Sequence, residues 1–162
     1  MATAKLGNAE KRSLARHMAV QAMYQYELNG TGITQLLVEF RPQDEPSEED
    51  AEMNALRRLA DFDYFQTLLS QTMEQEVALR DQIRPLLDRA WGSLDPVEQS
   101  ILLVSSCELK NQPHIPFRVV VNEAVELAKD MGAEDSYKYI NGVMDKLSKD
   151  YRRFEVAAHK KQ

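Results

Sequence analysis

The residues that most often carry catalysis or bind metals are few in this chain, and they are scattered along it. Its histidines are His17, His114 and His159, and their positions form no group with the spacing of metal ligands. The single cysteine, Cys107, stands in an apolar helical stretch, where a small core residue is a commoner role than a nucleophile. We therefore predict no metal, no cofactor and no catalytic residue.

Paired carboxylates and glycine-rich loops, which serve many enzymes, give no stronger signal. Glu123 and Glu126 lie one helical turn apart, but charged residues at that spacing are typical of the solvated face of an amphipathic helix. The chain has neither the glycine loop that cradles phosphates nor the fingerprint of dinucleotide-binding proteins. The sequence thus indicates a protein that binds rather than an enzyme.

Cations and aromatic residues occur together in two places. Lys11, Arg12 and Arg16 cluster on one predicted helix, and Tyr24 follows two turns after Arg16. Such a helix can present cations to phosphates while the aromatic ring stacks on an unpaired base, which is how proteins bind single-stranded RNA. Residues 137–139, Tyr-Lys-Tyr, repeat the combination. The alternative is structural: Tyr24 borders the core, and one of the two later tyrosines turns inward.

The net charge of −6 is unevenly distributed. Residues 1–16 hold four basic residues and one acid, and residues 146–162 hold six basic residues and two acids. Residues 39–63 hold nine acids and three arginines. The two basic ends suit a polyanion such as RNA, and two solvated tails are the alternative explanation.

The length of 162 residues predicts one domain, residues 1–162, or two small bundles that share a core. One cysteine cannot form an internal disulfide, and this suits a reducing compartment. We find no signal peptide at the start and no apolar run of the roughly 18 residues that a membrane span needs. We therefore expect a cytoplasmic protein with no membrane partner.

Apolar residues recur with helical spacing over nearly the whole chain. The first stripe predicts a helix over about 9–28, which Asn29-Gly30 ends because glycine readily takes the left-handed conformation at a helix terminus. A short helix to Phe40 follows. Residues 41–52 carry two prolines and six acids, so we predict a mobile surface loop that turns helical only after Ser47. The N-terminal helical part then spans about 9–78.

The C-terminal helical part is predicted over about 79–157. One helix runs to Gly92 with a kink or restart at Pro85, and Asp95, Pro96 and Glu98 begin the next as cap, first residue and capping-box partner. Further helices are expected over 117–131 and 136–154, and Gly142 is assigned to a close contact between two helices. The predicted class is all-α, with about seven helices, and neighbouring helices are expected to be mostly antiparallel.

Residues 116–147 resemble the signature of the NusB family. The resemblance rests on the block from Asn122-Glu123-Ala124 to Leu127-Ala128-Lys129 and on the block from Asn141-Gly142-Val143 to Asp145. Residues 16–24 and 95–109 also fit the family pattern. The resemblance implies two small helical bundles packed roughly perpendicular to each other.

The same resemblance implies a transcription antitermination factor. Such a factor binds the boxA element of nascent RNA together with the small-subunit ribosomal protein NusE. With other Nus factors it modifies RNA polymerase, notably on ribosomal RNA operons. The family's RNA contacts carry over to Lys11, Arg12, Arg16, Tyr24, Asp135, Lys138 and Tyr139. Its NusE contact carries over to Glu98.

Two departures and two alternatives accompany the resemblance. Ser13 and Leu14 stand where family members often have arginine, so we predict weak binding to boxA alone and stronger binding with NusE. Tyr139 stands where phenylalanine is common, which preserves stacking. One alternative is the RNA-targeting domain of ribosomal RNA methyltransferases, although no methyl-donor domain occurs up to Gln162. The other is a protein-binding helical adaptor that docks through its acidic segment.

Overall fold

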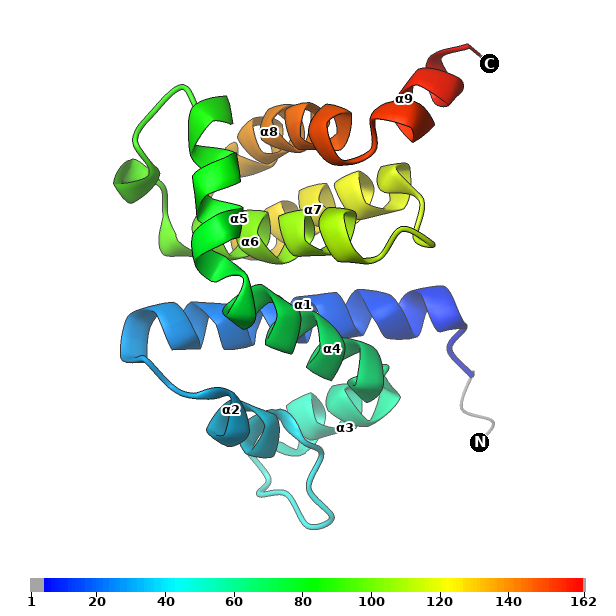
Figure 1. The fold of residues 1–162 in the computed structure, drawn as a ribbon. Helices are drawn as coiled ribbons and strands as arrows, with labels where there is room; N and C mark the ends of the chain where they lie inside the picture. Colours follow the sequence, from blue (N-terminus) through cyan, green and yellow to red (C-terminus); the bar gives the residue numbers. More distant parts are fainter. Residues whose placement is uncertain (1–4, 162) are drawn as a thin grey trace. The chain divides into compact units, whose positions relative to one another are not determined.

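The computed structural model describes residues 5–161, and within that range it contains α-helices and no strand (Figure 1). The α-helices are α1 (Asn8–Asn29), α2 (Ile33–Phe40), α3 (Ala51–Leu59), α4 (Phe62–Glu74), α5 (Glu76–Ile83), α6 (Pro96–Asn111), α7 (Phe117–Met131), α8 (Ser136–Tyr151) and α9 (Arg153–Lys160). The all-α class is confirmed, but the count of about seven was too low. The chain divides into two compact units, unit 1 up to Ser70 and unit 2 from Gln71.

Helix α1 is the long element of unit 1. It ends where the sequence predicted, because Gly30 adopts φ 68° and its N–H donates to the Tyr26 carbonyl. The α1 backbone also supports the start of α4, since the Lys11 carbonyl accepts a hydrogen bond of 3.1 Å from the Asp61 N–H. The ring centroids of Phe40 and Phe65 lie 5.5 Å apart in the core of this unit.

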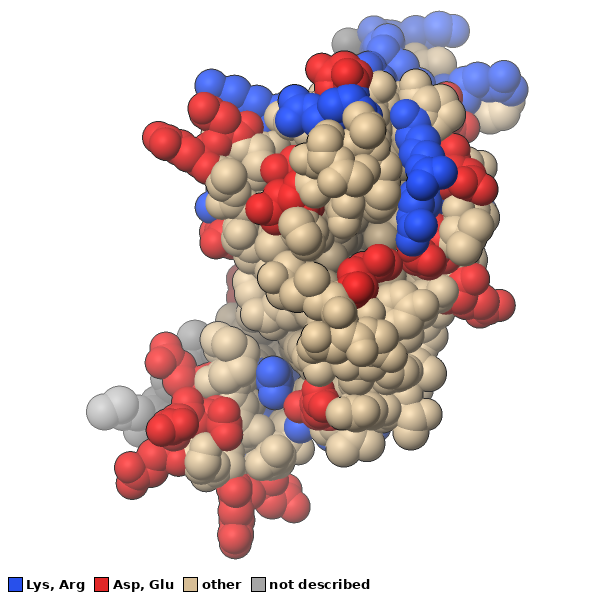
Figure 2. Space-filling view, turned by 90° about the vertical axis from the view of Figure 1, so that its left-hand side faces the viewer, with Lys and Arg blue, Asp and Glu red and all other residues tan. Residues whose placement is uncertain are grey.

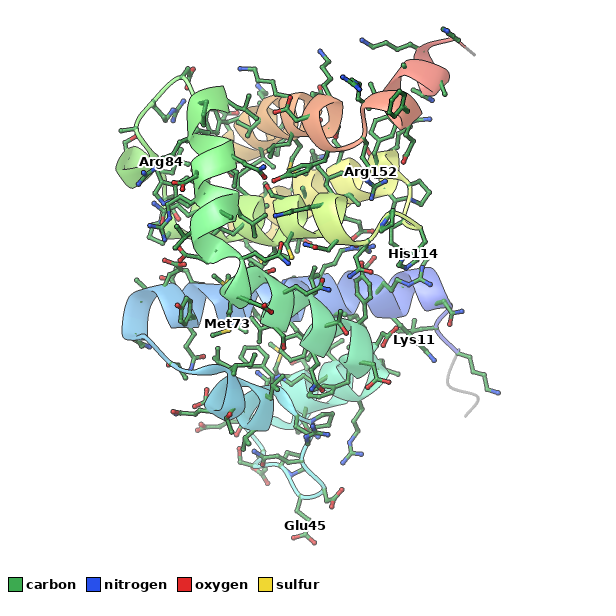
Figure 3. All side chains as sticks on the ribbon, in the orientation of Figure 1. Lys11, Glu45, Met73, Arg84, His114 and Arg152 are labelled. Carbon is green, nitrogen blue, oxygen red and sulfur yellow. The ribbon has the colours of Figure 1, made fainter. Side chains whose placement is uncertain are left out.

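Helix α3 was not predicted as a separate element, and tertiary contacts explain its stability. It follows the acidic segment and buries only Asn54, whose side chain exchanges two hydrogen bonds with the Gln43 backbone, at 2.7 and 3.0 Å. The Arg57 guanidinium lies 4.6 Å from the centroid of the Phe40 ring and donates to the Glu39 carbonyl. These contacts close the base of the loop, whose tip carries Glu45, away from Lys11 (Figure 3).

Helix α6 lies at the centre of unit 2, against α5, α7 and α8 (Figure 1). It begins as predicted: Asp95 accepts a hydrogen bond of 2.8 Å from the Val97 N–H, and Pro96 is the first residue. Every residue from Ser100 to Leu109 is buried, including Cys107, as expected for a helix that neighbours surround. Glu98 makes no hydrogen bond to the Asp95 N–H among the described residues, so the capping box is half formed.

The predicted helix after residue 79 was wrong in its second half. Helix α5 ends at Ile83, a 3-10 turn follows at Arg84–Leu86, and a second one lies at Trp91–Ser93. The proline ends the helix rather than kinking it, since Pro85 cannot donate the backbone hydrogen bond that the next turn needs.

The last predicted helix was also wrong at its end, because the chain breaks between α8 and α9 at Arg152. This side chain is buried, and its guanidinium donates to three backbone carbonyls (Leu109, Gln112 and Ile115), each at 2.8 or 2.9 Å. It also pairs with Glu155 at 2.8 Å, and Glu155 accepts from the Phe117 N–H. Arg152 thus joins the α8–α9 junction to the turn that carries His114 (Figure 3). Phe154, the last residue of the predicted helix, is 79% exposed.

The close glycine contact was assigned to the wrong glycine. Gly142 lies within α8, and a Cβ built there would meet nothing within 4 Å. Gly132 is the crowded position, since its Cβ would fall against Ser136 Oγ and 2.7 Å from the Ala128 carbonyl oxygen. Gly132 therefore lets α7 end and α8 begin in close contact.

Among residues 5–161, none of the helices has the length and apolar character to cross a membrane. The same residues contain no group of three or more histidine, cysteine, aspartate or glutamate side chains arranged to hold a metal ion.

Candidate nucleic-acid interface

The first predicted RNA-binding residues lie on the first three turns of α1 in unit 1. Lys11 and Arg12 are partly exposed there, and Lys11 projects near the N-terminal end of the helix (Figure 3). Tyr24 lies near the other end of α1 and is half-buried. The helix therefore presents two cations at its start and an aromatic ring about three turns later.

Arg16 differs from its two basic neighbours. Only 3% of it is exposed, and its guanidinium carbon lies 5.7 Å from the centroid of the Tyr64 ring. The spacing already carried this signal: Arg16 stands four residues before Val20 and seven before Met23, both buried. In this conformation Arg16 does not offer its charge to an external phosphate.

The second predicted group lies in unit 2, at the start of α8. Asp135 is exposed, and its carboxylate pairs with Lys138 at 3.6 Å. Two lysines flank the Tyr137 ring: Lys129 Nζ lies 5.2 Å and Lys138 Nζ 5.9 Å from its centroid. The corner between α7 and α8 therefore combines an accessible aromatic ring with two lysine cations, as a surface for unpaired bases would.

Arg89, which sequence reasoning missed, completes this group. Its guanidinium carbon lies 4.2 Å from the centroid of the Tyr139 ring, so the cation covers one face of the ring. The Tyr139 hydroxyl is enclosed, and burial, followed by the nearby Asp88 carboxylate, raises its pKa. We call Arg89, Lys129, Tyr137, Lys138 and Tyr139 the α8 corner.

Glu98, the predicted partner-binding residue, lies near the α8 corner. It sits in the first turn of α6, half-buried, and burial followed by the charge of Asp95 raises its pKa, while Arg89 opposes the shift. Glu98 also acts on the pKa of Tyr139, so the two side chains are electrostatic neighbours. The predicted partner-binding residue and one predicted RNA-binding residue of unit 2, Tyr139, are therefore close enough for their charges to interact.

The charges differ between regions of the surface, as the sequence suggested. Figure 2 shows red atoms gathered at the lower end of the face it displays, where the loop after α2 lies in Figure 1. On the upper part of that face, blue and red atoms alternate. Within unit 1, the acidic segment lies apart from the start of α1, as the labelled positions of Glu45 and Lys11 in Figure 3 show.

Comparison with known proteins assigns this architecture to a family. The sequence model of the NusB family matches residues 13–149. The transcription antitermination protein NusB of Chromohalobacter salexigens is 40% identical over 154 residues, which cover 94% of this chain and 93% of that protein. The protein of the same name from Thiobacillus denitrificans is 40% identical over 154 residues, covering 95% and 99%.

The fold agrees with a solved structure. The structure of T. maritima NusB superposes with a TM-score of 0.67 at 25% identity, and the match covers 92% of this chain and 93% of that one. The resemblance inferred from residues 116–147 is thus confirmed over nearly the whole chain. This chain belongs to the NusB family of transcription antitermination proteins, which are not enzymes.

Proposed function

We propose that this protein binds boxA-type RNA together with NusE and thereby modifies RNA polymerase, notably on ribosomal RNA operons in the cytoplasm. The observation that carries the proposal is the α8 corner, where cations lie against two tyrosine rings within 6 Å of their centroids. Exposed cations engage phosphates, and aromatic rings stack on unpaired bases. Lys11 and Arg12 supply further charge from unit 1.

The role of NusE follows from the small number of cations available to RNA. Ser13 and Leu14 replace arginines that are common in the family, Arg16 is buried, and Asp135 neutralises part of the Lys138 charge. The logarithm of the RNA-binding constant falls with the logarithm of the salt concentration, and each phosphate contact that is missing makes this slope shallower by about 0.7 for single-stranded RNA. Glu98 interacts electrostatically with Arg89 and Tyr139, so a partner docked at Glu98 would extend the RNA surface from the α8 corner.

This proposal predicts a large difference between binding with and without the partner. In filter binding at fixed salt, the protein should bind a boxA oligonucleotide weakly alone and at least tenfold more tightly with NusE present. A boxA oligonucleotide with its sequence scrambled is the control, and it should not gain from NusE. Equal affinity with and without NusE would rule out the cooperative mechanism.

Charge reversal at partly exposed basic residues distinguishes an RNA-binding protein from a protein-binding adaptor. Because Arg16 is buried, its replacement would disturb the fold, so the informative variant is Lys11→Glu combined with Arg12→Glu. An RNA-binding protein loses boxA affinity in this variant and retains binding to NusE. An adaptor that docks through the acidic segment keeps its partner and shows no RNA affinity to lose.

A further inference from the structure

Helix α9 lies outside residues 13–149, the range that the family's sequence model matches. One face of α9 packs against the rest of unit 2. On that face Glu155 accepts from the Phe117 N–H, Val156 is buried, and the His159 ring meets the Phe117 ring edge-on at 5.9 Å between centroids. The orientation of α9 is thus set, and its opposite face is presented to solvent.

The solvent face of α9 carries an aromatic ring between cations. Phe154 is 79% exposed, more than the other large apolar side chains that the described residues expose. The Arg153 guanidinium carbon lies 4.9 Å from the centroid of this ring and covers one side of it. Lys160 and Lys161 are exposed two turns further along. Helical spacing places Lys160 in line with Arg153, and Lys161 in line with Phe154.

The residues between these cations are small. Ala157 and Ala158 stand one turn after Arg153 and Phe154, and both are exposed. The neighbouring basic residue does not add to this charge, because Arg152 is buried and already paired with Glu155. The charge on the solvent face is therefore that of Arg153, Lys160 and Lys161.

An exposed ring flanked by cations has the composition of a surface for single-stranded nucleic acid, in which bases stack on the ring and phosphates meet the cations. A lipid surface would require a broad apolar face, whereas this face carries one large apolar side chain, two alanines and three cations. We propose that the solvent face of α9 (Arg153, Phe154, Lys160 and Lys161) is a second RNA-binding site, which holds single-stranded RNA flanking the segment that the α8 corner binds.

This inference rests on the proposed function, because it takes boxA-type RNA as the ligand. The test below distinguishes failure of the second site from failure of the proposed function. The probes are a labelled boxA oligonucleotide and the same RNA extended at either end by about eight nucleotides, within the length that one small surface covers. Affinity of the full chain with NusE is measured by fluorescence anisotropy. Phe154→Ala should weaken binding of one extended RNA by about tenfold, which corresponds to one base stack. The same variant should leave the affinity for the short RNA unchanged.

The matched control is Val77→Ala, which removes a similarly exposed apolar side chain (66%) from α5. It should change neither affinity. The variant Lys160→Gln with Lys161→Gln should lower the salt slope for the extended RNA by about 0.7 for each phosphate that it no longer neutralises. The proposal is overturned if Phe154→Ala binds both extended RNAs like the wild type, or weakens the short RNA equally. Failure of the wild type to bind the short RNA instead refutes the proposed boxA function.

Discussion

Replacing Arg152 with alanine is expected to lower the free energy of unfolding of unit 2 by about 3–5 kcal/mol, because it leaves several buried hydrogen-bond acceptors without a donor. The guanidinium donates to the carbonyls of Leu109, Gln112 and Ile115, and it pairs with Glu155. Truncation leaves these three carbonyls without their guanidinium donor in a buried place, whereas Glu155 is partly exposed and keeps its hydrogen bond from the Phe117 N–H. Arg152→Lys should recover only part of the stability, because an ammonium cannot reach several acceptors in one plane.

Urea unfolding followed by tryptophan fluorescence measures this effect, since the single tryptophan, Trp91, lies in unit 2. The matched control is its exposed neighbour, Arg153→Ala, for which a change within about 0.5 kcal/mol is expected. If Arg152→Ala unfolds within about 1 kcal/mol of the wild type, on the scale of an ordinary surface change, the junction does not depend on this arginine.

Alanine at Gly132 and alanine at Gly142 are expected to act with opposite signs. At Gly132 the new Cβ would fall against Ser136 Oγ and 2.7 Å from the Ala128 carbonyl, so we expect destabilisation by about 1–3 kcal/mol from overpacking. At Gly142 the Cβ would meet nothing within 4 Å inside α8, and the removal of glycine's flexibility should stabilise the helix by about 0.5–1 kcal/mol.

The two variants make the same chemical change, so each serves as the control for the other in thermal or urea unfolding. Gly132→Ala should also weaken boxA binding with NusE, because the α7–α8 connection places the α8 corner. Gly142→Ala should leave RNA affinity unchanged. If both variants raise the stability, or both lower it, the assignment of Gly132 as the crowded position is contradicted.

Sequence periodicity predicted the elements whose stability is local. Gly30, Asp95 and Pro96 end or begin helices through their own backbone and side-chain geometry, and the structure confirms all three. Helix α3 escaped prediction because its stability comes from distant partners of Asn54 and Arg57. The break at Arg152 was not predicted because Tyr151 and Phe154 continue the helical period. The carbonyls that hold Arg152 inward belong to the last turn of α6 and to the α6–α7 turn.

The candidate site was partly predictable for the same reason. Lys138 and Tyr139 are recognisable because they are adjacent in the sequence, whereas Glu98 was assigned to the partner contact only through the family resemblance. Arg89 could not be recognised from the sequence, because its cation reaches Tyr139 from an irregular segment far away in the chain. The resemblance assigned Arg16 to RNA, but its spacing with Val20 and Met23 agrees with its burial.

In vitro transcription with RNA polymerase, NusE and the other Nus factors tests the central claim most directly. Two templates are compared, one with boxA before a terminator and one with boxA scrambled. We predict that adding this protein raises readthrough on the boxA template alone, and that Lys11→Glu with Arg12→Glu abolishes the increase. Equal readthrough on both templates, with or without the protein, would contradict the proposal that it acts through boxA RNA.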